Sequence, residues 1–315
     1  MSDNITNPVA ADTADAAAPR SAAHGPTRKL TRAEQRAVDA KTRLSSPAAS
    51  LIAVVIAIVW TIPTAGLLIT SFRESSDIRR TGWWTAFTNP NFTLDNYAEA
   101  LGTSGLGDQF LNSIVITIPA VVIPIMLALL AAYAFAWIDF KGRDLLFVAV
   151  FALQVVPIQV TLVPLLTTYV KLGLNNTFWT VWLSHTIFGL PLAIFLLHNF
   201  MKEIPRSLIE AARVDGAGHV RVFFQVLMPL LMPAVASFGI FQFLWVWNDL
   251  LVGLTFAGTN QRPITVSIAE MVGSRGQAWH LLSSGAFISM IVPLAVFLSL
   301  QRFFVRGLLA GGVKG

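Results

Sequence analysis

A polar stretch between two long apolar segments decides the fold of this chain: Ile204-Pro-Arg-Ser-Leu-Ile-Glu-Ala-Ala-Arg-Val-Asp-Gly-Ala-Gly-His-Val-Arg-Val-Phe-Phe-Gln-Val-Leu-Met-Pro229. Pro205 suits the start of a helix, because its fixed φ is helical and its missing N–H is not needed there. The residues from Arg206 to Val214 are good helix formers. Asp215-Gly216 is expected to end this helix, since glycine accepts the left-handed conformation that often follows one.

The second half of the stretch predicts a further helix. A short amphipathic helix, about Ala217 to Leu227, is expected to run up to Pro229. The two helices would form a helix-turn-helix outside the bilayer, in which Ala211 and Ala212 let another surface approach closely. A loop that merely connects two spans is the alternative, and charge alone does not separate the two.

The composition is that of a polytopic membrane protein. The chain has 315 residues, of which 55% are hydrophobic and 12% charged, and its mean hydropathy is +0.65. Soluble domains carry about 25% charged residues. The absence of cysteine excludes disulfides and thiolate metal sites. The net charge of +5 does not indicate nucleic acid, because most of the basic residues flank the apolar segments.

The apolar segments predict an all-α membrane protein with six transmembrane helices. A span needs about 20 apolar residues to cross a hydrocarbon core of about 30 Å. Residues 1–46 are expected to form a cytoplasmic tail, and residues 47–315 the six-span domain with a polar loop at 202–229. The expected spans are about 48–72, 111–137, 145–170, 177–201, 231–257 and 282–304.

The positively charged residues predict the orientation. Sixteen lysines and arginines lie in the tail, the loop around Lys141, the polar loop and the C-terminus, whereas six lie on the opposite side. Positive charge collects on the cytoplasmic side, so both termini and the polar loop are expected there. Residues 1–25 lack apolar periodicity and are expected to be disordered. The basic segment 27–43 is either an amphipathic surface helix or, the favoured interpretation, a solvated tail that enforces topology.

A family resemblance starts in the polar loop. Glu210-Ala-Ala212 and Asp215-Gly-Ala217, followed by Phe223, Pro229 and Pro233, resemble the EAA loop of bacterial ABC importer permeases. In that family the loop is the coupling helix that docks into a groove on the ATPase subunit. The resemblance assigns ATPase coupling to Glu210, Ala211, Ala212, Asp215, Gly216 and Ala217. It implies that Glu210 pairs with an arginine of the ATPase, that Gly216 supplies the turn and that Asp215 braces it.

Further motifs extend the resemblance over about residues 47–315. Thr93-Leu-Asp-Asn-Tyr97, Asn112-Ser113, Ala131-Ala-Tyr-Ala-Phe135 and the C-terminal Gln301-Arg-Phe-Phe-Val-Arg-Gly307 are similar to stretches of carbohydrate-importer permeases of the maltose-transporter G subunit type. The type I permease fold of these importers is therefore expected. The two long external loops, 72–110 and 255–281, face the substrate-binding protein in that family, and a purely connecting role is the alternative for each.

The resemblance implies a set of partners in the bacterial cytoplasmic membrane. They are a second homologous permease subunit, an ABC ATPase dimer, an extracytoplasmic solute-binding protein, the lipid bilayer and a sugar. The chain is expected to be a transport subunit without a cofactor, with ATP and magnesium held by the ATPase. Consistent with this, the sequence has no Gly-x4-Gly-Lys-Ser/Thr phosphate loop.

Polar and aromatic residues inside the spans are the candidates for the sugar site. The main candidates are Gln154, Gln242, Trp247, Asn248 and Asp249, and Trp245, Gln159 and His185 are further ones. An intramembrane carboxylate such as Asp249 is a functional hypothesis by default. The alternatives are an interfacial aromatic belt and hydrogen bonds between helices.

Two other functions remain open from the sequence. A glycerol phosphate or a polyol is the alternative substrate for an importer permease. An ion-coupled secondary transporter would need intramembrane carboxylates as ion sites, and only Asp249 comes close. A membrane enzyme is disfavoured, because metal-spaced histidines, a Gly-x-Ser-x-Gly motif and paired intramembrane carboxylates are lacking.

Overall fold

A computed structural model describes residues 47–275 and 278–312, so the predicted tail at 1–46 lies outside the described residues. The chain divides into two units at residues 61 and 62, within the first described helix. The larger unit, 62–315, contains all the later helices. The described residues are helical apart from loops and one isolated β-bridge, between Arg73 and Phe92.

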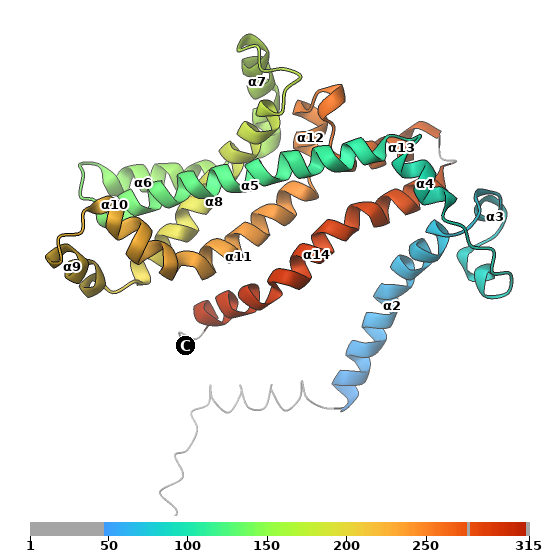
Figure 1. Cartoon of the computed structure of the whole chain (residues 1–315), viewed down its shortest axis with the longest axis horizontal. Coiled ribbons are helices and arrows are strands. Elements are labelled where there is room, and N and C mark those ends of the chain that lie inside the picture. The colour runs from blue at the N-terminus through green and yellow to red at the C-terminus, as the bar shows by residue number, and fades with distance from the viewer. Residues whose placement is uncertain (1–46, 276–277, 313–315) are drawn as a thin grey trace, which may run out of the picture. The chain divides into compact units, whose positions relative to one another are not determined.

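The helices are shown in Figure 1. In chain order they are α2 Pro47–Ser71, α3 Ser75–Arg80, η1 Trp83–Phe87, α4 Asp95–Leu101, α5 Leu106–Trp137, α6 Arg143–Ala152, η2 Leu153–Val155, α7 Ile158–Lys171, α8 Trp179–Glu203, α9 Arg206–Val214, α10 His219–Arg221, η3 Val222–Leu227, α11 Met228–Trp247, α12 Leu251–Phe256, η4 Thr259–Gln261, α13 Ile264–Arg275 and α14 Trp279–Gly312. Among the described residues, five helices are long and apolar enough to cross a membrane, or six if one bent pair counts as a span. The all-α membrane fold is thus confirmed.

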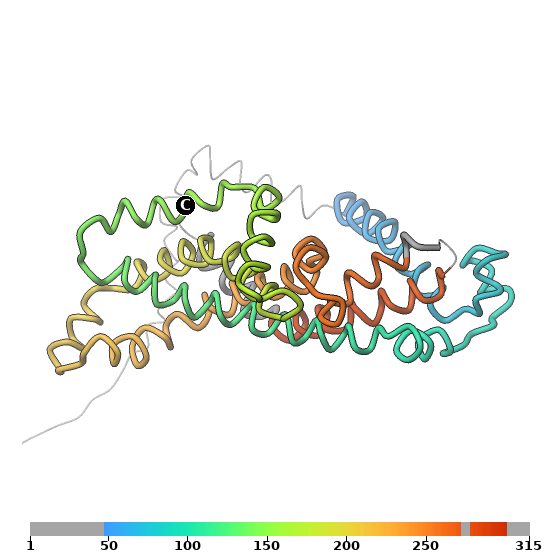
Figure 2. The backbone as a smooth tube through the Cα atoms, turned by 90° about the horizontal axis from the view of Figure 1, so that it is seen from above, coloured from blue at the N-terminus to red at the C-terminus, as the bar shows by residue number. Residues whose placement is uncertain are grey.

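The predicted span at 145–170 is not one continuous helix. The segments Arg143–Val155 and Ile158–Lys171 meet at an angle of 100°, and Figures 1 and 2 both show α7 turned away from the line of α6. The break lies at Val156, which is extended with φ −71° and ψ 120°. The ring of Pro157 disfavours helical backbone in the residue before it, and hydropathy does not report that effect.

The helix after the polar loop also differs from the prediction. A single helix runs from His219 to Trp247, so the helix predicted to end near Pro229 is not separate but continues into the span predicted from 231. The turn at Val222–Leu227 is a π-helix, in which hydrogen bonds join residues five apart instead of four. The bond over four residues that Pro229 cannot donate, because it has no N–H, is therefore not required there. The helix ends ten residues before the predicted 257, and α12 follows as a separate short helix.

Helix α5 is a main packing element of the larger unit. It packs most extensively against α8, and α11 packs against α5, α8 and α14. Small buried residues at Ala120, Ala128, Ala132 and Ala136 line its packed side. Small side chains allow close approach of helix backbones, which drives helix association in membranes.

Prolines in the spans create a further kind of contact. A proline lacks an N–H, so the carbonyl four residues before it has no partner within its own helix. Three such carbonyls each accept a hydrogen bond from the side chain of another helix: Trp182 Nε1 donates to Val115 O (3.1 Å, before Pro119), Gln242 Nε2 to Ala120 O (3.2 Å, before Pro124) and Trp247 Nε1 to Ser289 O (3.0 Å, before Pro293). The prolines are thereby tolerated at membrane depth.

The Thr-Leu-Asp-Asn-Tyr motif fastens the exit of α2. The buried Asn96 donates through Nδ2 to the carbonyls of Ser71 (2.9 Å) and Arg73 (2.7 Å). The hydroxyl of Tyr97 lies 2.7 Å from Ser71 Oγ. These contacts satisfy the carbonyls at the C-terminal end of a helix. Asn96 and Tyr97 therefore have a structural role within this external loop, and its docking on a binding protein stays a prediction.

Candidate functional site

Helix α9 presents the residues that the sequence singled out for coupling. Ile209 is buried, with 3% of its surface exposed, in the same cluster as Val222 and Phe223. Glu210 and Ala211 are exposed and Ala212 is half-buried. One side of α9 thus anchors it to the bundle, while the side carrying Glu210 is free for another protein.

The end of α9 is a Schellman motif. Gly216 has a φ of +79°, the N–H of Ala217 donates to Ala212 O (2.9 Å), and that of Gly216 donates to Arg213 O (3.0 Å). This pair of bonds satisfies the last carbonyls of the helix and requires a left-handed residue between them. The prediction that Gly216 supplies the turn is confirmed. Asp215 is exposed, and no hydrogen bond of its carboxylate is found among the described residues, so its bracing role stays a prediction.

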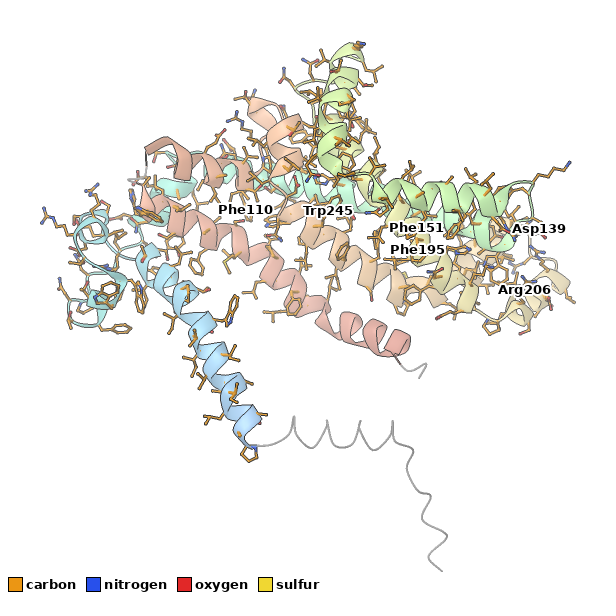
Figure 3. The ribbon with its side chains drawn as sticks, turned by 180° about the vertical axis from the view of Figure 1, so that it is seen from behind. Phe110, Asp139, Phe151, Phe195, Arg206 and Trp245 are labelled. Atoms are coloured by element: carbon orange, nitrogen blue, oxygen red, sulfur yellow. The ribbon has the colours of Figure 1, made fainter. Side chains whose placement is uncertain are left out.

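Figure 3 places α9 at one end of the bundle. Arg206 of α9 and Asp139 of the α5–α6 loop lie at the same end, Phe110 lies toward the other, and Trp245 lies between them. The residues proposed for coupling and the candidate residues of the sugar site are therefore separated along the helices. The helix from His219 to Trp247 runs from the end of the bundle near α9 to the candidate residues of the sugar site.

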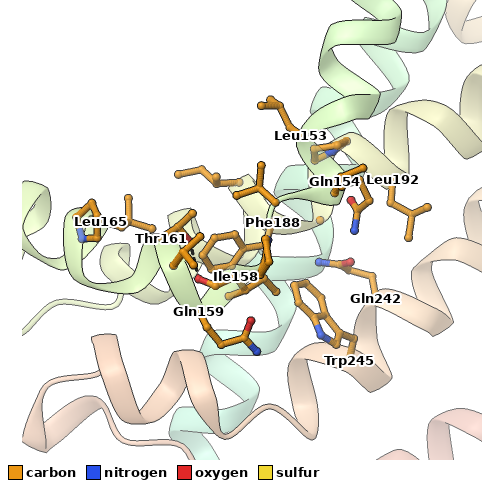
Figure 4. A pocket seen from close by; sticks show the side chains of 18 of the residues that line it. Leu153, Gln154, Ile158, Gln159, Thr161, Leu165, Phe188, Leu192, Gln242 and Trp245 are labelled. Atoms are coloured by element: carbon orange, nitrogen blue, oxygen red, sulfur yellow. Dashed lines mark hydrogen bonds between the residues drawn. The ribbon is translucent and has the colours of Figure 1, made fainter.

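A cavity opens at the break between α6 and α7. Its volume is about 760 Å³, within the range of about 300–1,000 Å³ usual for small-molecule sites. Its walls come from η2 and α7 on one side and from α8 and α11 on the other (Figure 4). The bend at Val156 and Pro157 thus creates the hollow, and both residues line it.

The cavity combines amides with aromatic rings. Gln154, Gln159 and Gln242 line it together with Trp245 and Phe188, and Figure 4 shows the side chains of Gln154, Gln242 and Trp245 around the same space. Amides offer both donors and acceptors. None of the described residues that line the cavity is charged. The walls are therefore suited to a neutral solute that carries hydroxyl groups.

The structure brings only part of the predicted sugar site together. Gln154 and Gln242, with the further candidates Gln159 and Trp245, share the cavity, whereas Trp247, Asn248 and Asp249 do not line it. Trp247 is 2% exposed, donates to α14 and stacks on Phe243 at 5.8 Å.

Asn248 and Asp249 serve the chain reversal after α11. Asn248 Nδ2 donates to Leu244 O at 2.8 Å. Asp249 Oδ2 accepts the N–H groups of Val252 (2.9 Å) and Gly253 (3.0 Å), which otherwise lack partners at the start of α12. The buried His185 lies with Nε2 3.9 Å from the same oxygen. Asp249 thus caps the start of α12, with His185 of α8 nearby but beyond hydrogen-bond distance of the carboxylate.

The comparisons with known proteins agree with this geometry. Residues 120–309 match the family model of the binding-protein-dependent transport system inner membrane component. The chain belongs to this family. It is a permease component of an ABC importer, embedded in a membrane through several helices. The ion-coupled secondary transporter that the sequence left open is thereby excluded.

Individual members of the family are closely similar to this chain. The osmoprotective compounds uptake permease protein GgtD of Synechocystis is 56% identical over 265 residues, which are 82% of this chain and 89% of that protein. The alpha-glucoside transport system permease protein AglG of Rhizobium meliloti is 50% identical over 258 residues, 78% of this chain and 68% of that protein. A crystal structure of a bacterial ABC transporter that imports alginate has a TM-score of 0.63 at 16% identity, covering 87% of this chain and 98% of its own, and shows that the fold is shared.

Gly189 is a site residue that the sequence reasoning missed. A Cβ added there would lie 2.9 Å from Nε2 and Oε1 of Gln242, and both residues line the cavity of this importer permease. A glycine inside a span often marks close approach of another group, so its position in the fourth predicted span was the available signal. Which side chain approaches it depends on the packing of α8 against α11, which the sequence does not specify.

Proposed function

We propose that this chain is one of two permease halves of an ABC importer in a bacterial cytoplasmic membrane and that it translocates a neutral sugar, most specifically an α-glucoside. The cavity lined by Gln154, Gln159, Gln242 and Trp245 is the observation that carries the substrate class. Three amides there provide donors and acceptors for hydroxyl groups. The indole offers an apolar face for the ring of a sugar.

The lack of charge along the cavity favours a sugar over a glycerol phosphate. A phosphate that leaves water needs cationic or N–H partners, because burying an uncompensated charge is costly. The described residues of the cavity wall supply amides and hydroxyls without a lysine or arginine. A polyol remains compatible with the amides, but it has no ring face to lie against Trp245.

The names of the relatives support the same class. GgtD is a permease for osmoprotective compounds and AglG one for alpha-glucosides. Both are at least half identical to this chain over most of its length. A neutral glucoside that accumulates as a compatible solute is consistent with the names of both relatives. Such a solute also suits the uncharged walls of the cavity.

The coupling side of the proposal rests on α9. Glu210 and Ala211 are exposed on this helix, and the buried Ile209 fixes the helix to the bundle. We propose that this side docks on a separate ABC ATPase dimer, which binds ATP and magnesium, and that Glu210 pairs with an arginine there. Removing one partner of such a partly buried ion pair is costly, because the other charge is left without a partner. Both chain termini then lie in the cytoplasm with α9, in agreement with the distribution of lysine and arginine.

A binding protein would deliver the solute on the opposite side. The alginate transporter has also been determined with an alginate pentasaccharide-bound periplasmic protein, and that structure covers 84% of this chain with a TM-score of 0.57. The second permease half would close the open side of the cavity at η2 and α7. Gln154 and Gln159 are exposed in the isolated chain, as expected if the other half completes their surroundings.

Purification from native membranes tests this assembly. The tagged chain would be isolated in mild detergent as wild type, as Glu210→Lys and as the control Asp139→Lys. Asp139 is an exposed carboxylate at the same end of the bundle. We expect a P-loop ATPase, a second six-span protein and a binding protein with the wild type and the control, and loss of the ATPase from Glu210→Lys. Isolation of the chain alone would contradict the proposal.

Uptake tests the substrate. The wild-type complex in proteoliposomes, with its binding protein, would be offered radiolabelled trehalose, sucrose and maltose, and separately glycerol 3-phosphate and glycine betaine. We expect ATP-dependent uptake of at least one α-glucoside and none of the two charged solutes. Uptake confined to glycerol 3-phosphate would overturn the neutral-sugar assignment while leaving the importer itself intact.

A further inference from the structure

A polar contact joins α5 to the segment that follows the coupling helix. The hydroxyl of Tyr133, near the end of α5, lies 2.7 Å from Nδ1 of His219, the first residue of α10. The two rings are nearly perpendicular, with centroids 6.0 Å apart, and Phe223 meets the same tyrosine ring edge-on at 5.5 Å. Tyr133 is 7% exposed, whereas His219 is exposed. The buried tyrosine thus gives a fixed anchor to an exposed histidine.

The position of His219 makes this contact mechanically important. Between α9 and the helix from His219 to Trp247 lie Gly216, with a φ of +79°, and Gly218. Glycines are the residues that change backbone angles most readily. A displacement of α9 could therefore be absorbed in this link unless another contact holds the far end of the link. The bond to Tyr133 is a directional contact at that end.

The two helices joined by this contact also meet at the cavity. The helix that begins at His219 carries Gln242 and Trp245, about 35 and about 39 Å further along at 1.5 Å per residue. Gln242 donates to Ala120 O of α5, which lies about 20 Å from Tyr133 by the same rise. The helices are therefore fastened to each other twice, once beside α9 and once at the cavity wall.

We infer that Tyr133 and His219 are positioning residues that pass the movement of α9 to the cavity walls, and so set how much solute is moved per ATP hydrolysed. This inference rests on the proposed function, because it assumes that an ATPase moves α9. Neither residue touches the proposed solute cavity. A defect in the pair would therefore change the coupling between hydrolysis and uptake, while the affinity for the solute stays the same.

Because the hydroxyl of Tyr133 contacts Nδ1 of His219, matched variants of this histidine can be made. Asparagine places its amide close to the position of Nδ1 and retains a partner for the hydroxyl, whereas glutamine places its amide nearer to Nε2. His219→Asn is therefore the conservative variant and His219→Gln the disruptive one of similar polarity. Tyr133→Phe removes the hydroxyl and retains the ring against Phe223. The helical segment and the buried cluster are left in place by all three variants.

The experiment uses the full complex in proteoliposomes, with trehalose uptake and ATP hydrolysis measured together. We expect Tyr133→Phe and His219→Gln to lower uptake per ATP about three- to tenfold, the range of one hydrogen bond. His219→Asn should stay within about twofold of the wild type, and the double variant Tyr133→Phe/His219→Gln should be no worse than Tyr133→Phe alone, whose hydroxyl also interacts with Arg213 of α9. The half-saturating trehalose concentration should not change. Single variants that couple as well as the wild type, or effects that multiply in the double variant, would overturn the inference.

A second readout separates this inference from the proposed function. The ratio of ATP hydrolysis with and without the binding protein requires no transported solute. If the wild type shows this stimulation but no trehalose uptake, the variants are compared by the ratio, and the substrate assignment fails only if sucrose and maltose are not taken up either. If no ATPase accompanies the wild type, the proposed function itself fails. If the wild type is stimulated and every variant is stimulated equally, the inference about Tyr133 and His219 fails alone.

Discussion

The side-chain amide of Gln242 on α11 donates a hydrogen bond of 3.2 Å to the main-chain oxygen of Ala120 on α5. Ala120 lies four residues before Pro124, so no N–H within α5 is available to this oxygen. Gln242 is 1% exposed, and an unpaired carbonyl at this depth is costly. Gln242 is therefore explained first as the donor to a carbonyl that Pro124 leaves without a partner in the neighbouring helix α5.

Removing the donor is expected to destabilise the protein. Gln242→Leu leaves the oxygen of Ala120 without a partner, and we expect a loss of about 1–2 kcal/mol in the free energy of unfolding. The partner variant is Pro124→Ala, which restores an N–H within α5. In that background Gln242→Leu should cost less than half as much. The thermal midpoint of the purified complex in detergent, measured for all four combinations, gives the coupling between the two sites.

Equal costs of Gln242→Leu in both backgrounds would contradict this explanation. The amide would then owe its stabilising effect to contacts other than the oxygen of Ala120. Gln242 also lines the cavity, so its replacement is expected to change uptake as well. Stability, rather than transport, is therefore the measurement that isolates the hydrogen bond.

Gly189 is expected to tolerate no side chain. The added Cβ of Gly189→Ala would lie 2.9 Å from the amide of Gln242, which its bond to α5 holds in place. Overpacking of this kind typically costs about 1–3 kcal/mol. Gly239→Ala in α11 is the matched control, because its Cβ would meet only Ile125 Cδ1, at 3.6 Å. The control should keep or raise the thermal midpoint, and an equal drop in both variants would refute the steric argument.

Trp245 and Trp247 lie two residues apart, but we expect Trp245 to affect sugar binding and Trp247 to affect stability. Trp245 lines the cavity, so Trp245→Leu should raise the half-saturating sugar concentration with little change in thermal midpoint. Trp247→Phe retains an aromatic ring beside Phe243 but loses the donor to Ser289 O. It should lower stability by about 1 kcal/mol and leave the half-saturating concentration unchanged. Uptake curves and thermal midpoints of both variants test this. If Trp247, also a candidate from the sequence, binds the sugar instead, Trp247→Phe would raise the half-saturating concentration and Trp245→Leu would not.

Local signals in the sequence predicted the coupling region well. The bounds of α9 and the positive φ of Gly216 follow from one proline, one glycine and a run of helix formers, all within a few residues. The polar residues of the spans are equally plain in the sequence. Their partners are not, because a hydrogen bond such as that between Trp182 and Val115 depends on which helices pack together.

The break at Val156 marks the limit of a hydropathy argument. An apolar segment of span length predicts a crossing of the membrane but not a break of 100° within it, although the pair Val156-Pro157 carries the signal for the bend. Prolines within α5 and α14 do not break those helices, so a proline alone does not decide the matter. The cavity follows from this bend, and for that reason the sequence identifies Gln154 and Gln242 without showing that they share one wall.

Gly216 provides the last prediction, which concerns coupling rather than folding. Its φ of +79° is reached freely by glycine and by asparagine at some cost, whereas a β-branched side chain is strained there. Gly216→Val should therefore cost about 1–3 kcal/mol locally and misplace the exit of α9. Because the residue is exposed and no atom lies within 4 Å of an added Cβ, the spans should still assemble. We expect normal amounts of complex in the membrane, with uptake per ATP lowered for Gly216→Val and largely retained for Gly216→Asn. Equal uptake per ATP for Gly216→Val and the wild type would mean that the left-handed turn is not needed to hold α9 for coupling.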